Sequence, residues 1–214
     1  MSNHRGNLQT RTLATGLLWQ SKEEQMHDPG GKVRLALSND VVSTAEFGGD
    51  RKEFRYTLKR VWDTSLGSVL FIMMNPSTAD ENDDDPTVAK CQRYARAWGY
   101  GAILVGNTFA YRATNQKDLM QVPDPVGPRN DEWLLNMAAQ AGLIVLAYGK
   151  PHKNLCQRGF YVVKLLQDAG HELHALKLCN DGTPSHPLYL KGTLKPSLFG
   201  EAENILTTEA LRVE

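Results

Sequence analysis

Three polar side chains stand where they could act on a bound ligand. Asn75 directly follows the apolar run 69–74, and Asn107 closes the apolar run that begins at Ala102. His186 lies in a loop between two prolines, which restrict its backbone. An amide offers one acceptor oxygen and two donor hydrogens, which suits the edge of a nucleobase, a ligand carbonyl or a water molecule. A histidine in a rigid loop can donate a hydrogen bond or stabilise negative charge.

Each of these residues also has an ordinary structural explanation. Asn-Pro is common in turns, an asparagine can close a strand-to-loop turn, and a loop histidine can simply be solvated. The hydroxyl of Ser77 would face the same ligand as Asn75, although serine is common in turns too. Tyr111 and Arg112 follow Asn107 closely. They would contact a base or a phosphate, or lie at the rim of the site.

Several familiar kinds of site lack their sequence signatures. The chain has no glycine-rich dinucleotide fingerprint, no P-loop and no GxSxG elbow. The acidic run 80–85 lacks EF-hand spacing, so we expect it to cap a helix and solvate a loop. The cysteines at 91, 156 and 179 are widely spaced without a CxxC pair, which favours structural roles over a zinc site. We therefore expect no metal and no cofactor.

The composition is that of a globular protein with a hydrophobic core. Of 214 residues, 41% are hydrophobic and 22% are charged, and the formal net charge is +0. This balance neither supports nor excludes nucleic-acid binding, because a local basic patch can coexist with an acidic one. The sequence contains no apolar run long enough for a transmembrane helix and no signal-peptide pattern. We expect a cytoplasmic monomer without a membrane partner.

The elements that would position these residues alternate along the chain. Buried strands are expected near 69–74, 102–107, 143–149 and 171–178, with helices near 86–98, 130–141, 153–169 and 201–211. This order predicts an α/β fold: a three-layer α/β/α sandwich with a four-stranded, mainly parallel central sheet. Right-handed crossovers would bring Asn75, Asn107 and the loop 179–191 to one edge.

The N-terminal part of the chain is expected to differ from this central domain. Residues 41–63 show an alternation of charged and apolar residues that predicts antiparallel strands, added to the sandwich as an extension. Residues 1–40 contain a strong breaker cluster and predict an extension or arm. Residues 41–214 are expected to form a single α/β domain.

Several short motifs resemble those of a bacterial and phage family, domain-of-unknown-function family 1643. They are MNPSTADENDDDPTV, GNTFAYRAT, GPRND, AYGK and GTPSHPLYL, and they occur in order between about residues 43 and 199. This resemblance indicates a family without indicating an activity.

A more distant resemblance is to the uracil-DNA glycosylase superfamily. The segment Met73–Ser77 is similar to its first motif, the run ending in Asn107 to its base-reading strand, and His186-Pro187 to its last motif. The resemblance implies hydrolysis of the bond between a base and its sugar in DNA, after the base has left the stack.

The same resemblance implies a role for most of the candidate residues. Asn75 would orient the attacking water and His186 would stabilise the departing base. Asn107 would read that base, and Ser77 and Tyr111, candidates from their residue types and positions alone, would contact it as well. Leu188 or Tyr189 would fill the vacated stack, and Arg112 and Lys191 would hold phosphates. The implied partner is DNA, single- or double-stranded, or a nucleotide.

Two other functions fit the same residues. One is a non-catalytic module that binds a nucleic acid or a nucleotide, and the neutral net charge favours it. The other is an enzyme that acts on free nucleotides or nucleosides. The feature that discriminates between catalysis and binding is whether Asn75 and His186 share one cavity with Asn107.

Overall fold

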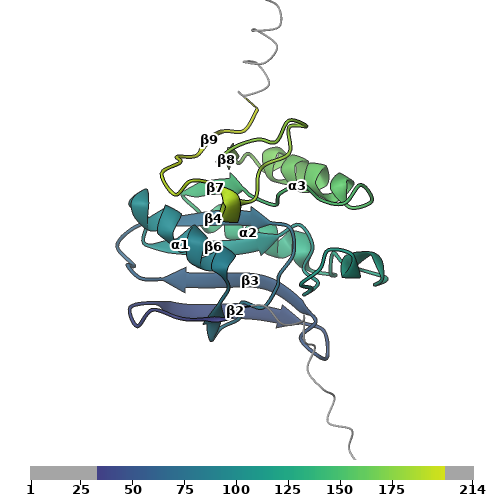
Figure 1. The fold of residues 1–214 in the computed structure, drawn as a ribbon, viewed down its shortest axis with the longest axis horizontal. Coiled ribbons are helices and arrows are strands. Elements are labelled where there is room, and N and C mark those ends of the chain that lie inside the picture. Colours follow the sequence, from purple (N-terminus) through teal and green to yellow (C-terminus); the bar gives the residue numbers. More distant parts are fainter. Residues whose placement is uncertain (1–32, 201–214) are drawn as a thin grey trace, which may run out of the picture.

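A seven-stranded mixed sheet forms the centre of the part of the chain that the computed structural model describes, residues 33–200 (Figure 1). From one edge to the other its strands are β2 (Val42–Gly48), β3 (Phe54–Val61), β6 (Ala102–Asn107), β4 (Ser68–Met73), β7 (Leu143–Leu146), β8 (His174–Ala175) and β9 (Ser197–Leu198). Neighbours among β6, β4, β7 and β8 pair in parallel, whereas β2, β3 and β9 lie antiparallel to their neighbours. The four expected parallel strands are confirmed, but the expected four-stranded sheet is wrong, because antiparallel strands extend it to seven on both sides.

The antiparallel segment expected over 41–63 is present, but it is not a separate extension. Residues 58–61 of β3 pair with residues 102–105 of β6, so β2 and β3 belong to the central sheet. The fourth parallel strand is shorter than expected over 171–178, because the chain turns back on itself soon after β8. Strand β9 forms in a region where only a loop was expected.

Three α-helices cover the two faces of the sheet. They are α1 (Pro86–Ala97), α2 (Asn130–Gln140) and α3 (Cys156–Asp168), close to the expected ranges. Helix α1 packs on one face, where it shares a core cluster with β4 and β6 (Figure 1). Helices α2 and α3 pack on the other face in a second cluster. The expected three-layer α/β/α sandwich is therefore confirmed.

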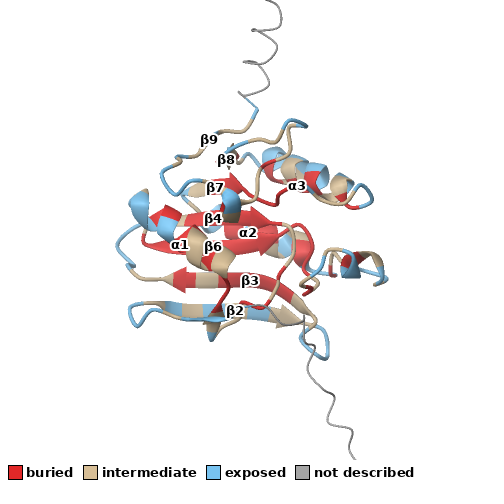
Figure 2. Ribbon diagram, in the orientation of Figure 1, coloured by how far each residue is buried: buried red, intermediate tan, exposed pale blue. Residues whose placement is uncertain are grey.

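Strand β4 shows why its sequence is apolar without interruption. Val69, Phe71 and Met73 point into the cluster beneath α1, and Leu70 and Ile72 point into the cluster beneath α2 and α3. A strand between two helical layers buries both of its faces, so neither side can be polar. Figure 2 shows the same contrast across the sheet, with buried central strands and an edge strand β2 of exposed and intermediate residues.

Smaller elements complete the described residues. Strands β1 (Leu35–Ala36) and β5 (Asp83–Asp84) form a separate two-stranded antiparallel pair, and η1 (Asp118–Met120) and η2 (Pro187–Tyr189) are short 3₁₀ helices. Residues 33–40 of the expected N-terminal arm are thus partly ordered by β1. Residues 1–32 of this expected arm, and the helix expected near 201–211, lie outside the described residues.

Gly106 on β6 is a point where the helix layer approaches the sheet closely. A Cβ atom there would lie 2.7 Å from Leu134 Cδ2 and 2.8 Å from Met137 Cε, both on α2. Gly106→Ala is therefore expected to lower the free energy of unfolding by about 1–3 kcal/mol, the usual effect of overpacking a core. Urea denaturation measures this change. Gly192→Ala is the control, because a Cβ there meets nothing within 4 Å and should leave stability nearly unchanged.

Candidate functional site

A cleft of about 760 Å³ opens at the carboxyl ends of β4, β6 and β7. The connections that leave β4 and β6 pass to opposite faces of the sheet, and ligands of open α/β sheets bind at such switch points. The cleft is lined by these residues expected from the sequence: Asn75, Ser77, Asn107, His186, Leu188 and Tyr189. The remaining three, Tyr111, Arg112 and Lys191, are not among its lining residues.

Asn107 is the most unusual residue of the cleft. Its side chain lines the cleft, yet the residue is only 1% exposed. Both its Oδ1 and its Nδ2 lack a hydrogen-bond partner among residues 33–200. A buried polar group without a partner costs about 1–3 kcal/mol, so such groups are rare in native proteins and need an explanation. The amide is thus ready to accept one hydrogen bond and to donate two to a ligand.

The backbone around Asn107 is held firmly in place. Asn130, at the start of α2, donates from Nδ2 to the carbonyl of Asn107 at 2.9 Å and to that of Thr108 at 3.2 Å. Arg158 on α3 donates from Nε to the same Thr108 carbonyl at 2.7 Å. Two helices therefore fix the end of β6, and the free amide of Asn107 is preorganised rather than mobile.

Asn75 differs from Asn107 in that the nitrogen of its side-chain amide is hydrogen-bonded and only the oxygen is left for a ligand. Its Nδ2 donates to the carbonyl of Ala113 at 2.6 Å and to that of Pro76 at 3.1 Å, whereas no described residue bonds to its Oδ1. The nitrogen therefore anchors the loop, and the oxygen is the atom available to a water molecule or a ligand donor. An aspartate here would bring a carboxylate oxygen against two carbonyl oxygens. Ser77 lies near Thr114, with 3.4 Å between their hydroxyl oxygens.

His186 reaches the cleft from the loop that precedes η2. Its Nδ1 accepts from the backbone N–H of Leu188 at 3.4 Å, which in a neutral ring places the hydrogen on Nε2. Gly149, just after β7, packs against it: φ is 69°, and a Cβ would lie 3.0 Å from His186 Cβ. Glycine is thus required there by both the backbone conformation and the close approach.

Helix α1 holds the loop that carries His186. Two side chains of α1 and one at its C-terminal cap donate to backbone carbonyls of that loop: Lys90 Nζ to Leu190, Tyr94 Oη to Lys191 and Trp98 Nε1 to Leu194. No local signal could have revealed these contacts, because the partners lie 96–100 residues apart.

Tyr94→Phe tests how much one of these bonds contributes to the position of the loop. It removes the 2.8 Å hydrogen bond to the Lys191 carbonyl but keeps the ring, which is 1% exposed. We expect a loss of about 1 kcal/mol in the free energy of unfolding and faster amide hydrogen exchange over 186–194. The control is Tyr161→Phe, whose ring is 52% exposed and should matter little. Unchanged exchange in Tyr94→Phe would contradict the positioning role.

Of the three expected site residues outside the cleft, Arg112 and Tyr111 contact residues around the β2–β3 turn, and Lys191 faces the solvent. Arg112 is buried, donates from Nη1 to the Lys52 carbonyl at 3.1 Å and stacks over Phe47. The ring of Tyr111 meets that of Phe54 edge-on. Lys191 has an exposed side chain. Their expected contacts with a base or a phosphate therefore remain predictions.

Arg55 is a cleft residue that the sequence did not reveal. The alternation in β3 predicted a half-exposed strand with its charged side chains outward, but Arg55 is only 2% exposed and lines the cleft. The reason is a β-bulge: Glu46 faces Thr57 and Phe47 faces Arg55, so β3 carries one extra residue there. The bulge changes which face the side chains occupy.

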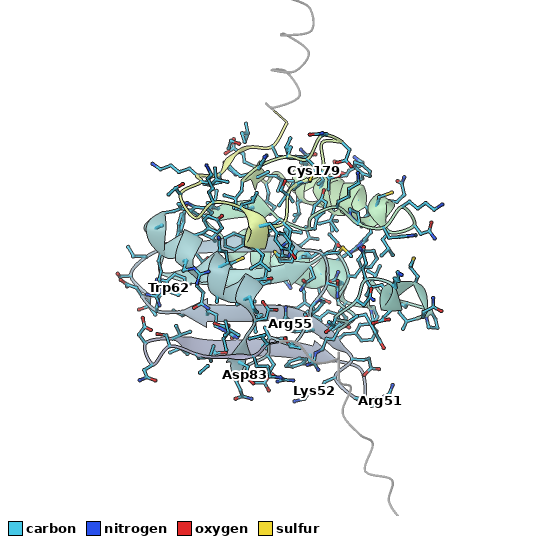
Figure 3. All side chains as sticks on the ribbon, viewed as in Figure 1. Arg51, Lys52, Arg55, Trp62, Asp83 and Cys179 are labelled. Atoms are coloured by element: carbon cyan, nitrogen blue, oxygen red, sulfur yellow. The ribbon has the colours of Figure 1, made fainter. Side chains whose placement is uncertain are left out.

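The contacts of β3 show the effect of this bulge. Arg60 is completely buried and pairs with the carboxylate of Asp84 at 2.9 Å. Arg55 donates to the carbonyl of Ala79, in the same acidic loop. Two residues five positions apart would point to opposite faces of a regular strand. Without the bulge, Arg55 would lie on the face of α2, where Tyr56 instead stacks on Trp133. Figure 3 labels Arg55 near β3.

Three charged side chains line the cleft. Asp85 caps α1, and its Oδ1 accepts from the N–H groups of Thr87 and Val88 at 2.8 and 2.9 Å, as the sequence predicted. Lys150 is mostly exposed and bridges to Asp181 at 2.7 Å, and this contact lowers the pKa of Asp181 to about 2. Burial lowers the pKa of Arg55 to about 10, which Asp85 opposes, so its guanidinium stays charged at neutral pH.

The sequence of the cleft region places the chain in a known family. Residues 55–188 match the family described as protein of unknown function (DUF1643). The chain belongs to the DUF1643 family. The match begins at Arg55 and ends at Leu188, both of which line the cleft, and it confirms the family expected from the motifs. No curated protein and no solved structure matches the chain, so the resemblance of this DUF1643 protein to uracil-DNA glycosylases stays a prediction.

Two further observations concern the described part of this DUF1643 chain. Within residues 33–200, no three side chains of His, Cys, Asp or Glu gather closely enough to hold a metal ion. No helix in the same part of the chain has the length and apolarity needed to cross a membrane.

Proposed function

We propose that the protein binds one nucleobase of DNA in the cleft and hydrolyses the bond between that base and its sugar. The observation that carries the proposal is the unpartnered, buried amide of Asn107 in a cleft that Asn75 and His186 also line. An amide with a free acceptor and two free donors can read the Watson–Crick edge of a base that has left the stack. Asn75 and His186 share this cleft with Asn107, which supports hydrolysis over binding alone.

The reaction begins at the amide oxygen of Asn75, which bonds to no described residue. Oδ1 of Asn75 accepts a hydrogen bond from water and directs its oxygen at the sugar C1′. As the new C1′–O bond forms, the C1′–N bond breaks and its electron pair leaves with the base nitrogen. The N–H group at Nε2 of His186 stabilises the resulting negative charge on the base. A proton from the water ends on the base, and the products are a free base and an abasic sugar.

The mouth of the cleft has a side chain suited to the vacated stack. Tyr189 is 84% exposed and lines the cleft, next to Leu188 in η2. Its ring lies 5.7 Å from that of His186. In the proposed complex, Tyr189 or Leu188 enters the gap left by the base, because burial of an apolar ring offsets part of the lost stacking.

The test is base release from single- and double-stranded oligonucleotides that carry uracil, hypoxanthine, 5-hydroxymethyluracil or mismatched thymine. The wild type should release at least one of them, and Asn75→Ala should reduce the rate by about 100-fold or more, the usual effect of losing a group that positions a reactant. Asn154→Ala, a change to an exposed asparagine outside the cleft, is the control. A wild type that binds these oligonucleotides but releases nothing would leave only the binding function.

A second candidate function is the binding or cleavage of a free nucleoside or nucleotide in the same cleft. The observation that favours it is the small number of cations that line the cleft, Arg55 and Lys150. Lys150 is already bridged to Asp181, and Arg55 is buried. A groove for a DNA backbone usually presents several exposed lysines or arginines.

A further inference from the structure

Arg55 is a buried cation whose guanidinium is not in direct contact with a carboxylate, although Asp85 is near enough to raise its pKa. It lines the cleft at 2% exposure, and no carboxylate among residues 33–200 forms an ion pair with it. Its guanidinium donates to the Ala79 carbonyl, and its buried Nε has no hydrogen-bond partner in the same part of the chain. Buried charges are as a rule paired, because the desolvation of an unpaired ion is highly unfavourable.

Arg60 shows what a satisfied buried arginine looks like in this protein. It is fully buried on the same strand, and it pairs with the carboxylate of Asp84 and donates to the carbonyls of Asp80 and Asp83. Arg60 does not line the cleft, whereas Arg55 does. The arginine that lacks a carboxylate is therefore the one that a ligand can reach.

Two of the buried side chains that have polar atoms without a hydrogen-bond partner among residues 33–200, Arg55 and Asn107, line the cleft. Asn107 ends β6, the neighbour of β3, and its free amide lines the same cleft as Arg55. The first N–H groups of α1 are no alternative anion site, because Asp85 already accepts from Thr87 and Val88. The cleft, at about 760 Å³, is also larger than a single pyrimidine ring requires.

We propose that the ligand of this cleft carries an anionic group in addition to its base, and that Arg55 binds that group while Asn107 binds the base. A planar guanidinium suits both a carboxylate and a phosphate, because each accepts two parallel hydrogen bonds. The anion can thus belong to an acidic substituent on the base or to the phosphate of a free nucleotide. This inference rests on one part of the proposed function, the binding of a base in the cleft. It does not require that the protein hydrolyses the bond between that base and its sugar.

Matched pairs of small ligands test this inference and distinguish the two sources of the anion. Calorimetry would compare uracil with orotate, which adds a carboxylate, and uridine and inosine with their 5′-monophosphates. The wild type should bind the anionic member of at least one pair about tenfold more tightly or better, as one charge-assisted hydrogen bond provides. Equal affinity within every pair would overturn the proposal.

Substitutions then assign the preference to one residue. Arg55→Met should remove the preference, and Arg93→Met, a change to an exposed arginine outside the cleft, should keep it. A preference that persists in a folded Arg55→Met would overturn the proposal.

Should Arg55→Met fail to fold, the side-chain Nε–H resonance of Arg55 in the wild type replaces it as the readout. It is assigned as the peak absent from Arg55→Lys. This resonance should shift with the anionic member of a pair and not with the neutral one, and no shift with the anion would overturn the proposal.

This proposal and the proposed function can fail separately. Anion binding that depends on Arg55, without release of any base from DNA, would reject hydrolysis and retain the anion site. Release of neutral bases from DNA, without any preference for anionic ligands, would retain hydrolysis and reject the anion site.

Discussion

Asn107→Leu is expected to weaken the binding of the base-carrying oligonucleotides by about 100-fold or more, since it removes hydrogen bonds worth ~1.5 kcal/mol each. The same substitution should raise the free energy of unfolding by about 1–2 kcal/mol. Leucine has nearly the shape of asparagine, and it replaces a buried amide whose two polar atoms lack partners among the described residues. A substitution that stabilises the fold while it abolishes binding identifies a group kept for its ligand.

Asn130→Leu is the matched control for this experiment. Asn130 is also 1% exposed, but its Nδ2 donates to the Asn107 and Thr108 carbonyls. Its loss should lower the free energy of unfolding by about 2 kcal/mol, because the buried Asn107 carbonyl loses this donor, whereas the Thr108 carbonyl keeps Arg158. Fluorescence anisotropy and urea denaturation measure the two quantities. If Asn107→Leu destabilises the protein as Asn130→Leu does and leaves binding intact, Asn107 is a structural residue.

His186→Ala is expected to reduce the rate of base release by about 100- to 1000-fold, the usual effect of losing one donor to a developing negative charge. The dissociation constant of the oligonucleotide should change far less, because His186 acts on charge that appears only as the bond breaks. Single-turnover kinetics separate the rate of the chemical step from binding. His186→Gln should recover part of the rate, because an amide can also donate.

His171→Ala controls for the loss of an imidazole elsewhere, since His171 does not line the cleft. A second result would argue against the catalytic role of His186. If His186→Ala raises the dissociation constant as much as it lowers the rate, the histidine serves to hold η2 against Gly149 and has no special role in the chemical step.

The main elements of the fold were predictable because their signals are local. The uninterrupted apolar run of β4 indicated a strand buried on both faces, and the structure places alternate residues of it in two cores. Asp85 followed by proline predicted the start of α1, and its carboxylate caps that helix. Parallel strands joined by helices bring their carboxyl ends to one edge. This rule correctly brought Asn75, Asn107 and His186 to one cleft.

The cleft residues that the sequence did not reveal depend on register and on distant contacts. The position of Arg55 follows from a bulge opposite Glu46 and Phe47, and a change of register by one residue reverses the faces of a strand. The alternation of side chains in β3 contains no trace of that bulge. The hydrogen bond from Tyr94 to Lys191 joins residues 97 positions apart, and only the packed chain brings them together.

The residue types and their order along the chain were therefore enough to predict the layers of the fold and the ends of its strands. They were also enough to predict that two asparagines and a histidine lie together at the carboxyl edge of the sheet. The tertiary structure alone set the burial and the hydrogen-bond partners of the cleft residues, which are the properties that make the cleft a candidate ligand site. It left both polar atoms of the Asn107 amide without partners among residues 33–200, and it buried Arg55 in the same cleft. The reason is that the partners of a buried polar group come from strand register and loop docking, which depend on residues far apart in the chain.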